Sequence, residues 1–114
     1  MMILAVETAT SVQSVAVVGE NGLCATEAVK QTRSLATATD RSHRWSIMPA
    51  IDRLLNALNV TLCDIDGFVV SIGPGSFTGL RVGLATMKGL AYGTNKPLVA
   101  VPTLHALAFN VAGL

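Results

Sequence analysis

The sequence has 114 residues, enough for one domain that buries a core of its own. Hydrophobic residues make up 51% of the chain and charged residues 13%, which excludes an intrinsically disordered protein. The net charge is +1 and no two lysines or arginines are adjacent, which argues against the broad cationic surface of a nucleic-acid-binding protein. The mean hydropathy of +0.55 is high for a small soluble protein and predicts a surface that something else covers.

The sequence predicts a cytoplasmic protein without a membrane segment. Its longest apolar stretch, residues 98–114, is interrupted by proline, histidine and asparagine. It is also shorter than the roughly 20 apolar residues that span a bilayer. The opening MMILAV lacks the basic segment of a signal peptide. Cys24 and Cys63 have no metal-ligand spacing, and two lone thiols fit a reducing compartment.

Three strands joined by short turns are expected within residues 2–30. MILAVETA and SVQSVAVVGENG are apolar, β-branched runs that end in small polar or turn-forming residues. LCATEAVK alternates its side chains between two faces, as a third strand does. Together these runs predict an antiparallel meander. Residues 31–45 lack a clear period and are interpreted as a connection.

From Ser46 onward the pattern becomes one of helices alternating with strands. Apolar residues recur at helical spacing from 46 to 58, and Pro49 fits the first turn of a helix. GFVVSIG is typical of a strand buried on both faces. A helix over about 79–93, the strand PLVAV and a helix opening at Thr103 follow. The order β-β-β-α-β-α-β-α predicts an α/β fold with a mixed five-stranded sheet.

The stretch SIGPGSFTGLRVG, residues 71–83, admits two interpretations. In the first, Gly73, Gly75 and Ser76 form a phosphate loop, because free N–H groups at a helix N-terminus attract anions. Glu7 and Thr8, at the end of the first strand, would then lie near a metal–phosphate group. However, the spacing G-x-G-x-x-x-G matches neither the dinucleotide fingerprint nor a P-loop, and the lysine of a P-loop is missing.

The second interpretation, which we favour, assigns these glycines to close packing between helices. A helical projection places them on a stripe made of Gly79, Gly83, Thr86, Leu90 and Gly93. A separate apolar stripe made of Leu80, Leu84, Met87 and Ala91 would lie on the sheet. The glycine stripe would then let a second helix approach closely. Combined with the apolar positions of the preceding helix, it predicts a pairing interface that also includes Ile47, Ile51 and Leu54.

No set of residues with the chemistry of a catalytic or metal centre is recognised. His43 has no second histidine or cysteine at ligand spacing, and His105 lies in an apolar helix, where a core or interface role is expected. Asp40, Ser42 and His43 are neighbours in sequence, whereas a catalytic triad is assembled by the fold. We therefore expect no catalytic residue, no metal and no cofactor.

The opening strand, the element order and the glycine-rich stretch together resemble the N-terminal half of the TsaB family, also called YeaZ. ILAVETAT is similar to the family's first strand, SIMPAI to its first helix and GPGSFTGLRVGLATMKGLA to its signature. The resemblance covers nearly the whole chain. It implies a ribonuclease H-like half of the fold shared by actin, Hsp70 and sugar kinases. By the same resemblance, residues 1–114 form the N-terminal actin-like domain, and the C-terminal domain of the family is absent.

The resemblance also implies a non-catalytic subunit that supports formation of threonylcarbamoyladenosine at adenosine 37 of tRNA. Its partners would be a TsaD-like catalytic subunit and a TsaE-like ATPase. The chain alone would form a homodimer, and tRNA would be contacted only indirectly.

The chain departs from the family at positions that matter for nucleotide and metal chemistry. The family commonly has aspartate where Glu7 stands, superfamily phosphate loops prefer glycine where Ala9 stands, and the usual His-Ser-Glu is here His43-Arg44-Trp45. Two other hypotheses stay open. One is an ATP-binding phosphotransferase half-domain that uses Glu7, Thr8 and the turn over 73–79, and the other is a glycoprotease-like peptidase.

Overall fold

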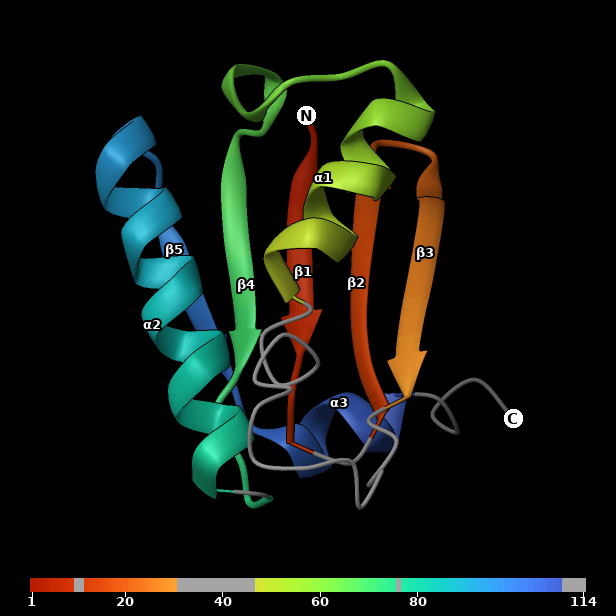
Figure 1. Ribbon diagram of the computed structural model, residues 1–114. Helices are drawn as coiled ribbons and strands as arrows, with labels where there is room; N and C mark the ends of the chain where they lie inside the picture. Colours follow the sequence, from red (N-terminus) through yellow and green to blue (C-terminus); the bar gives the residue numbers. More distant parts are fainter. Residues whose placement is uncertain (10–11, 31–46, 76, 110–114) are drawn as a thin grey trace, which may run out of the picture.

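The computed structural model describes residues 1–9, 12–30, 47–75 and 77–109, which form a five-stranded sheet with helices packed on it (Figure 1). The strand order across the sheet is β3-β2-β1-β4-β5. In chain order the elements are β1 (Ile3–Glu7), β2 (Val12–Gly19), β3 (Gly22–Lys30), α1 (Ile47–Leu58), the 3₁₀ turn η2 (Leu62–Asp64), β4 (Gly67–Ser71), α2 (Phe77–Thr94), β5 (Leu98–Val101) and α3 (Thr103–Phe109). The predicted order is confirmed, except that α2 begins at Phe77 rather than near Gly79 and that η2 was not expected. The connection predicted over 31–45 lies outside the described residues.

The sheet is mixed because its first three strands form a meander and its last two arrive by crossovers. β1 pairs antiparallel with β2, and β2 pairs antiparallel with β3. The turn between β2 and β3 passes through Gly22, whose φ of 108° lies in the region that favours glycine. β4 pairs parallel with β1 and β5 pairs parallel with β4. The carboxyl ends of β1, β4 and β5 therefore lie along one edge of the sheet.

The core lies between one face of the sheet and the helices α1 and α2. Figure 1 shows both helices on the same side of the sheet, where α1 packs on β2 and β3 and α2 packs mainly on β4. Alternate residues of the strands point into this layer, and its fully buried members include Leu4, Val17, Phe68 and Val70. Because successive strand residues point to opposite faces, the same register fixes which side chains reach the helices.

α1 uses its whole apolar face to close this core. Ile47, Ile51 and Leu54 are 2%, 1% and 4% exposed and belong to the hydrophobic cluster. The helix packs on β2 and β3, so these side chains are already covered within the domain. The prediction that they line an interface with a second chain is therefore wrong. The reason is that α1 has one apolar face, and the sheet occupies it.

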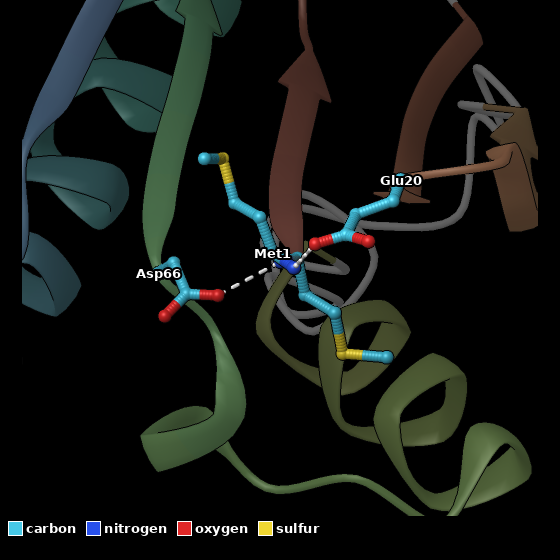
Figure 2. A network of polar contacts seen from close by, with 4 residues as sticks. Met1, Glu20 and Asp66 are labelled. Carbon is cyan, nitrogen blue, oxygen red and sulfur yellow. Dashed lines mark hydrogen bonds and ion pairs between the residues drawn. The ribbon is translucent and has the colours of Figure 1, made fainter.

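The start of the chain is tied to the strands on either side of β1 (Figure 2). The Met1 ammonium group donates to a carboxylate oxygen of Glu20 at 3.0 Å. The Met2 N–H donates to Oδ2 of Asp66 at 2.9 Å, and the Asp66 N–H donates to the Met2 carbonyl at 2.8 Å. These groups are exposed, so the contacts contribute little free energy, but they align the beginnings of β1 and β4.

Candidate functional site

Glu7 ends β1 at the edge where the parallel strands finish. Its Oε1 accepts a hydrogen bond from the Ser71 hydroxyl at 2.6 Å and another from the Ala9 N–H at 2.7 Å. Ser71 is the last residue of β4, so one carboxylate oxygen joins two strands and the loop that follows β1. Glu7 is thus half-buried and bound within the fold, unlike a solvent-facing acid.

Thr8 is fully buried between this edge of the sheet and α2. Its hydroxyl has no hydrogen-bond partner among the described residues. An unpaired buried hydroxyl costs about 1–3 kcal/mol. The Thr8 side chain lies against Gly83 of α2, where an added methyl group would overlap the hydroxyl oxygen. Thr8 therefore fills space under α2 and is closed to solvent.

The glycine-rich loop after β4 packs directly on the loop after β1. A methyl group added to Gly75 would lie 2.5 Å from the methyl group of Ala9, so only glycine permits this close approach. Gly73 has a φ of 101°, and its peptide bond with Pro74 is cis. The Gly73 N–H donates to Thr103 Oγ1 at 3.1 Å, and the Thr103 N–H donates to the Gly73 carbonyl at 2.8 Å. The loop is thus held between the end of β1 and the start of α3.

The structure brings together four of the five residues that the sequence suggested for a phosphate site, namely Glu7, Thr8, Gly73 and Gly75. The fifth, Ser76, lies outside the described residues. The Ala9 methyl group lies between the two loops and fills the space in which N–H groups would surround a phosphate. Sequence reasoning missed Ser71 and Thr103 in this site. Their roles depend on contacts between distant segments, which no local pattern signals.

The face that α2 turns to the sheet agrees with the predicted one at Met87 and Ala91 but not in the first two turns, where Leu80 and Leu84 are only half-buried. Its buried residues are Gly79, Gly83, Met87 and Ala91. The predicted glycine stripe is therefore divided, because Gly79 and Gly83 lie inside the domain while Thr86 and Leu90 are half-buried and Gly93 is exposed. The prediction that Gly79 and Gly83 receive the helix of a second chain is wrong. At Gly83 the physical reason is Thr8, which already occupies the space beside it.

Two glycines of α2 face away from the sheet and have no packing partner among the described residues. Methyl groups added to Gly89 and Gly93 would meet no atom of another segment within 4 Å. Gly89 was not singled out in the sequence, although it lies one helical turn before Gly93. We define the outer flank of α2 as Thr86, Gly89, Leu90 and Gly93. Its other three members, Thr86, Leu90 and Gly93, are the part of the predicted interface on α2 that is not fully covered within the domain.

The described part of the chain contains no group of three histidine, cysteine or acidic side chains that would hold a metal ion. His43 lies outside that part, so its predicted lack of ligand partners is not examined by the structure. His105 is exposed on α3, and a core role for it is wrong. Within the same residues, no helix is both long and apolar enough to cross a bilayer.

Comparison with known proteins places this geometry in a family. Residues 32–113 match the family model described as "TsaD: tRNA N6-adenosine threonylcarbamoyltransferase". The tRNA threonylcarbamoyladenosine biosynthesis protein TsaB of Escherichia coli (strain K12) is 34% identical over 108 residues, which cover 95% of this chain and 43% of that protein. The protein of the same name from Bacillus subtilis (strain 168) is 34% identical over 96% of this chain and 44% of its own length. The chain thus spans less than half the length of these curated relatives.

Solved structures give the same result for the fold. YeaZ from Pseudomonas aeruginosa superposes with a TM-score of 0.74 at 27% identity, over 90% of this chain and 45% of that one. Thermus thermophilus RuvC superposes with a TM-score of 0.57 at 16% identity, over 90% of this chain and 64% of its own, and shares the fold alone. The α/β fold is the ribonuclease H-like, actin-like one that the sequence predicted. The chain belongs to the TsaB family, also called YeaZ.

Proposed function

We propose that this chain acts in the biosynthesis of threonylcarbamoyladenosine in tRNA as a non-catalytic pairing subunit. In this proposal it corresponds to the N-terminal, actin-like domain of its relatives and docks on a TsaD-like catalytic subunit. That subunit modifies adenosine 37, and a TsaE-like ATPase joins the assembly. The names of the relatives support the pathway, and the outer flank of α2 supports the pairing role.

The observation that carries the pairing role is the pair of unpacked glycines on α2. A glycine inside an exposed helix costs about 1 kcal/mol relative to alanine. At Gly83 the domain itself explains the glycine, because Thr8 leaves no room for a side chain. At Gly89, in contrast, the described residues leave open space where a methyl group would stand. A partner helix that approaches the backbone of α2 closely would explain why glycine stands at position 89.

The loops at the edge of the sheet support a role without nucleotide chemistry. A phosphate cradle needs free backbone N–H groups at an accessible helix N-terminus. Here the Ala9 N–H donates to Glu7, and the Ala9 methyl group stands against Gly75. Among the described residues, the one buried hydroxyl without a partner is that of Thr8, and it lies under α2. These residues look like a phosphate site whose space is taken up by packing.

The first prediction tests the pairing surface with Gly89→Leu. A leucine there finds open space within the chain, so the variant folds as well as the wild type, but the side chain pushes away a facing helix backbone. We expect its affinity for a purified TsaD-like subunit, measured by biolayer interferometry, to fall at least tenfold. Ala106→Leu, which places the same side chain at an exposed position on α3, is the control and should bind like the wild type.

Circular dichroism of both variants must first give the wild-type helix content. A folded Gly89→Leu variant that binds the TsaD-like subunit with unchanged affinity would contradict the proposed docking surface. The phosphotransferase hypothesis makes a different forecast, since it requires magnesium-dependent ATP binding. Calorimetry that detects such binding at low micromolar affinity would replace the pairing role with an enzymatic one.

A further inference from the structure

The charges of this chain are separated along the sequence. All seven acidic residues lie within residues 1–66, whereas residues 67–114 contain Arg81, Lys88 and Lys96 and no acid. The three cations belong to α2 and to the turn that follows it. The net charge of the whole chain is only +1, but residues 67–114 alone carry a charge of +3. A low net charge therefore does not describe the local field at α2.

The same cations lie on the outermost stripe of α2, together with two aromatic side chains. Residues spaced by three or four positions share one side of a helix. One row of residues with this spacing lies on the side of α2 opposite its buried face. It consists of Phe77, Arg81, Ala85, Lys88, Tyr92 and, just beyond the helix end, Lys96. From Phe77 to Tyr92 it runs for about 22 Å at 1.5 Å per residue. We call these six residues the outer stripe, which is distinct from the outer flank.

Five residues of the outer stripe are exposed, Lys96 is half-buried, and none of the six is acidic. Phe77 is 72% exposed and Tyr92 is 92% exposed. The Arg81 guanidinium carbon lies 5.3 Å from the centre of the Phe77 ring, close enough for a cation–π contact. No ion pair joins Arg81, Lys88 or Lys96 to an acid within the part of the chain that the structure describes.

The stripe ends in an open hollow of about 640 Å³ between the end of α2 and the start of β5. Its lining residues are Lys88, Ala91, Tyr92, Asn95, Lys96 and Leu98. Two ammonium groups and one phenol ring therefore border a single concavity. Cations that follow a groove, with aromatic rings placed between them, are the features by which proteins hold single-stranded nucleic acid.

We propose that the outer stripe of α2 binds RNA directly, an inference that rests on the proposed function and deepens it by adding a contact to the tRNA itself. Arg81, Lys88 and Lys96 would neutralise backbone phosphates. Tyr92 and the Arg81-covered ring of Phe77 would stack on unpaired bases. The binding is weak and sensitive to salt, because three cations are few.

RNA fits this stripe better than a protein partner does. Arginine and aromatic residues occur in both kinds of interface, but lysine is depleted in protein interfaces, and the stripe holds two lysines and no acid. The glycines proposed for protein docking lie on the outer flank, on a neighbouring side of the helix.

The second prediction uses a fluorescein-labelled single-stranded RNA oligonucleotide and measures anisotropy from 50 to 200 mM KCl. Three phosphate contacts give a slope of log K against log salt of about −2 for a single strand. Lys88→Gln/Lys96→Gln should reduce that slope to about −0.7. Tyr92→Ala should weaken binding about tenfold without changing the slope, because stacking releases no counterions. Unlabelled, unmodified tRNA transcript should displace the probe.

The matched control changes the net charge equally at another place. Met48→Glu/Pro49→Glu adds two negative charges at exposed positions in the first turn of α1, where acidic residues are tolerated. It should bind RNA with the wild-type slope. If it weakens binding as much as the lysine variant does, the effect is one of net charge and the proposal fails.

Two further outcomes also overturn the proposal. In one, the lysine variant keeps the wild-type slope. In the other, the stripe variants lose the TsaD-like subunit but keep the RNA, which would make the stripe a protein-docking surface. The two proposals fail separately. Gly89→Leu tests protein docking and keeps every cation and aromatic side chain of the stripe, and the lysine variant tests RNA binding and keeps both glycines of the flank.

Discussion

Gly83 and Gly89 lie on the same helix but in opposite surroundings, and the two positions should respond oppositely to the same substitution. An added methyl group at Gly83 overlaps the Thr8 hydroxyl, whereas at Gly89 it meets no other segment. We expect Gly83→Ala to lower the free energy of unfolding by about 1–3 kcal/mol through overpacking. Gly89→Ala should raise it by about 0.5–1 kcal/mol through helix propensity. Urea unfolding followed by circular dichroism measures both, and a Gly83→Ala variant at least as stable as the wild type would show that Gly83 does not pack on Thr8.

Thr8 supplies a second prediction for a single residue. Its hydroxyl is buried and has no partner among the described residues, so it has lost its hydrogen bonds to water and no protein hydrogen bond replaces them. Thr8→Val keeps the shape of the side chain and removes that group, and should raise the free energy of unfolding by about 1 kcal/mol. Thermal and urea unfolding of the free chain provide the measurement. A loss of stability would mean that the hydroxyl has a bonding partner, and the loop after β1 would then need a new interpretation.

At the scale of elements, the sequence predicted every strand and α-helix because each carries its own period. The two-residue alternation of the strands and the helical spacing in α1 come from one buried face each, and both are local signals. α2 is different because its first two turns face the loop after β1, where only glycine fits beside Thr8. Hydrophobicity alone therefore assigned the buried side to the stripe that begins with Leu80 and Leu84, although both are only half-buried.

The candidate site shows the same limit more sharply. The sequence assigned Glu7 and the loop over 73–75 to one candidate site, because both follow strand ends. The bond from Ser71 to Glu7 joins residues 64 positions apart, and it exists because β1 and β4 are parallel neighbours. The contact of Ala9 with Gly75 arises in the same way, from two loops at one edge. Such contacts follow from strand order, and strand order is a property of the whole sheet.

On the scale of the whole molecule, the high mean hydropathy of the chain corresponds to apolar side chains that are exposed on its surface. Large apolar side chains that are more than half exposed include Phe77, Tyr92, Val99, Leu104 and Leu107. They belong to α2, β5 and α3, the same half of the chain that has no acid. The opposite side of the sheet from α1 contributes Val99 of β5, next to α3. A surface of this composition favours association, because few charges oppose it.

The last prediction is that the chain alone forms a dimer through the outer flank of α2. A two-fold axis beside this helix sets Gly89 and Gly93 of one protomer against the same residues of its partner, the simplest closed arrangement. An isologous contact repeats every clash, so Gly89→Leu introduces two leucines into one interface and should dissociate the dimer. Light scattering coupled to size-exclusion chromatography, from about 5 to 500 μM, should show a concentration-dependent shift toward the dimer for the wild type and for Ala106→Leu, and a monomer for Gly89→Leu. A wild type that stays monomeric at the highest concentration would mean that the unpacked glycines serve a different chain only. If the Gly89→Leu variant still dimerises, the two-fold axis does not lie beside α2.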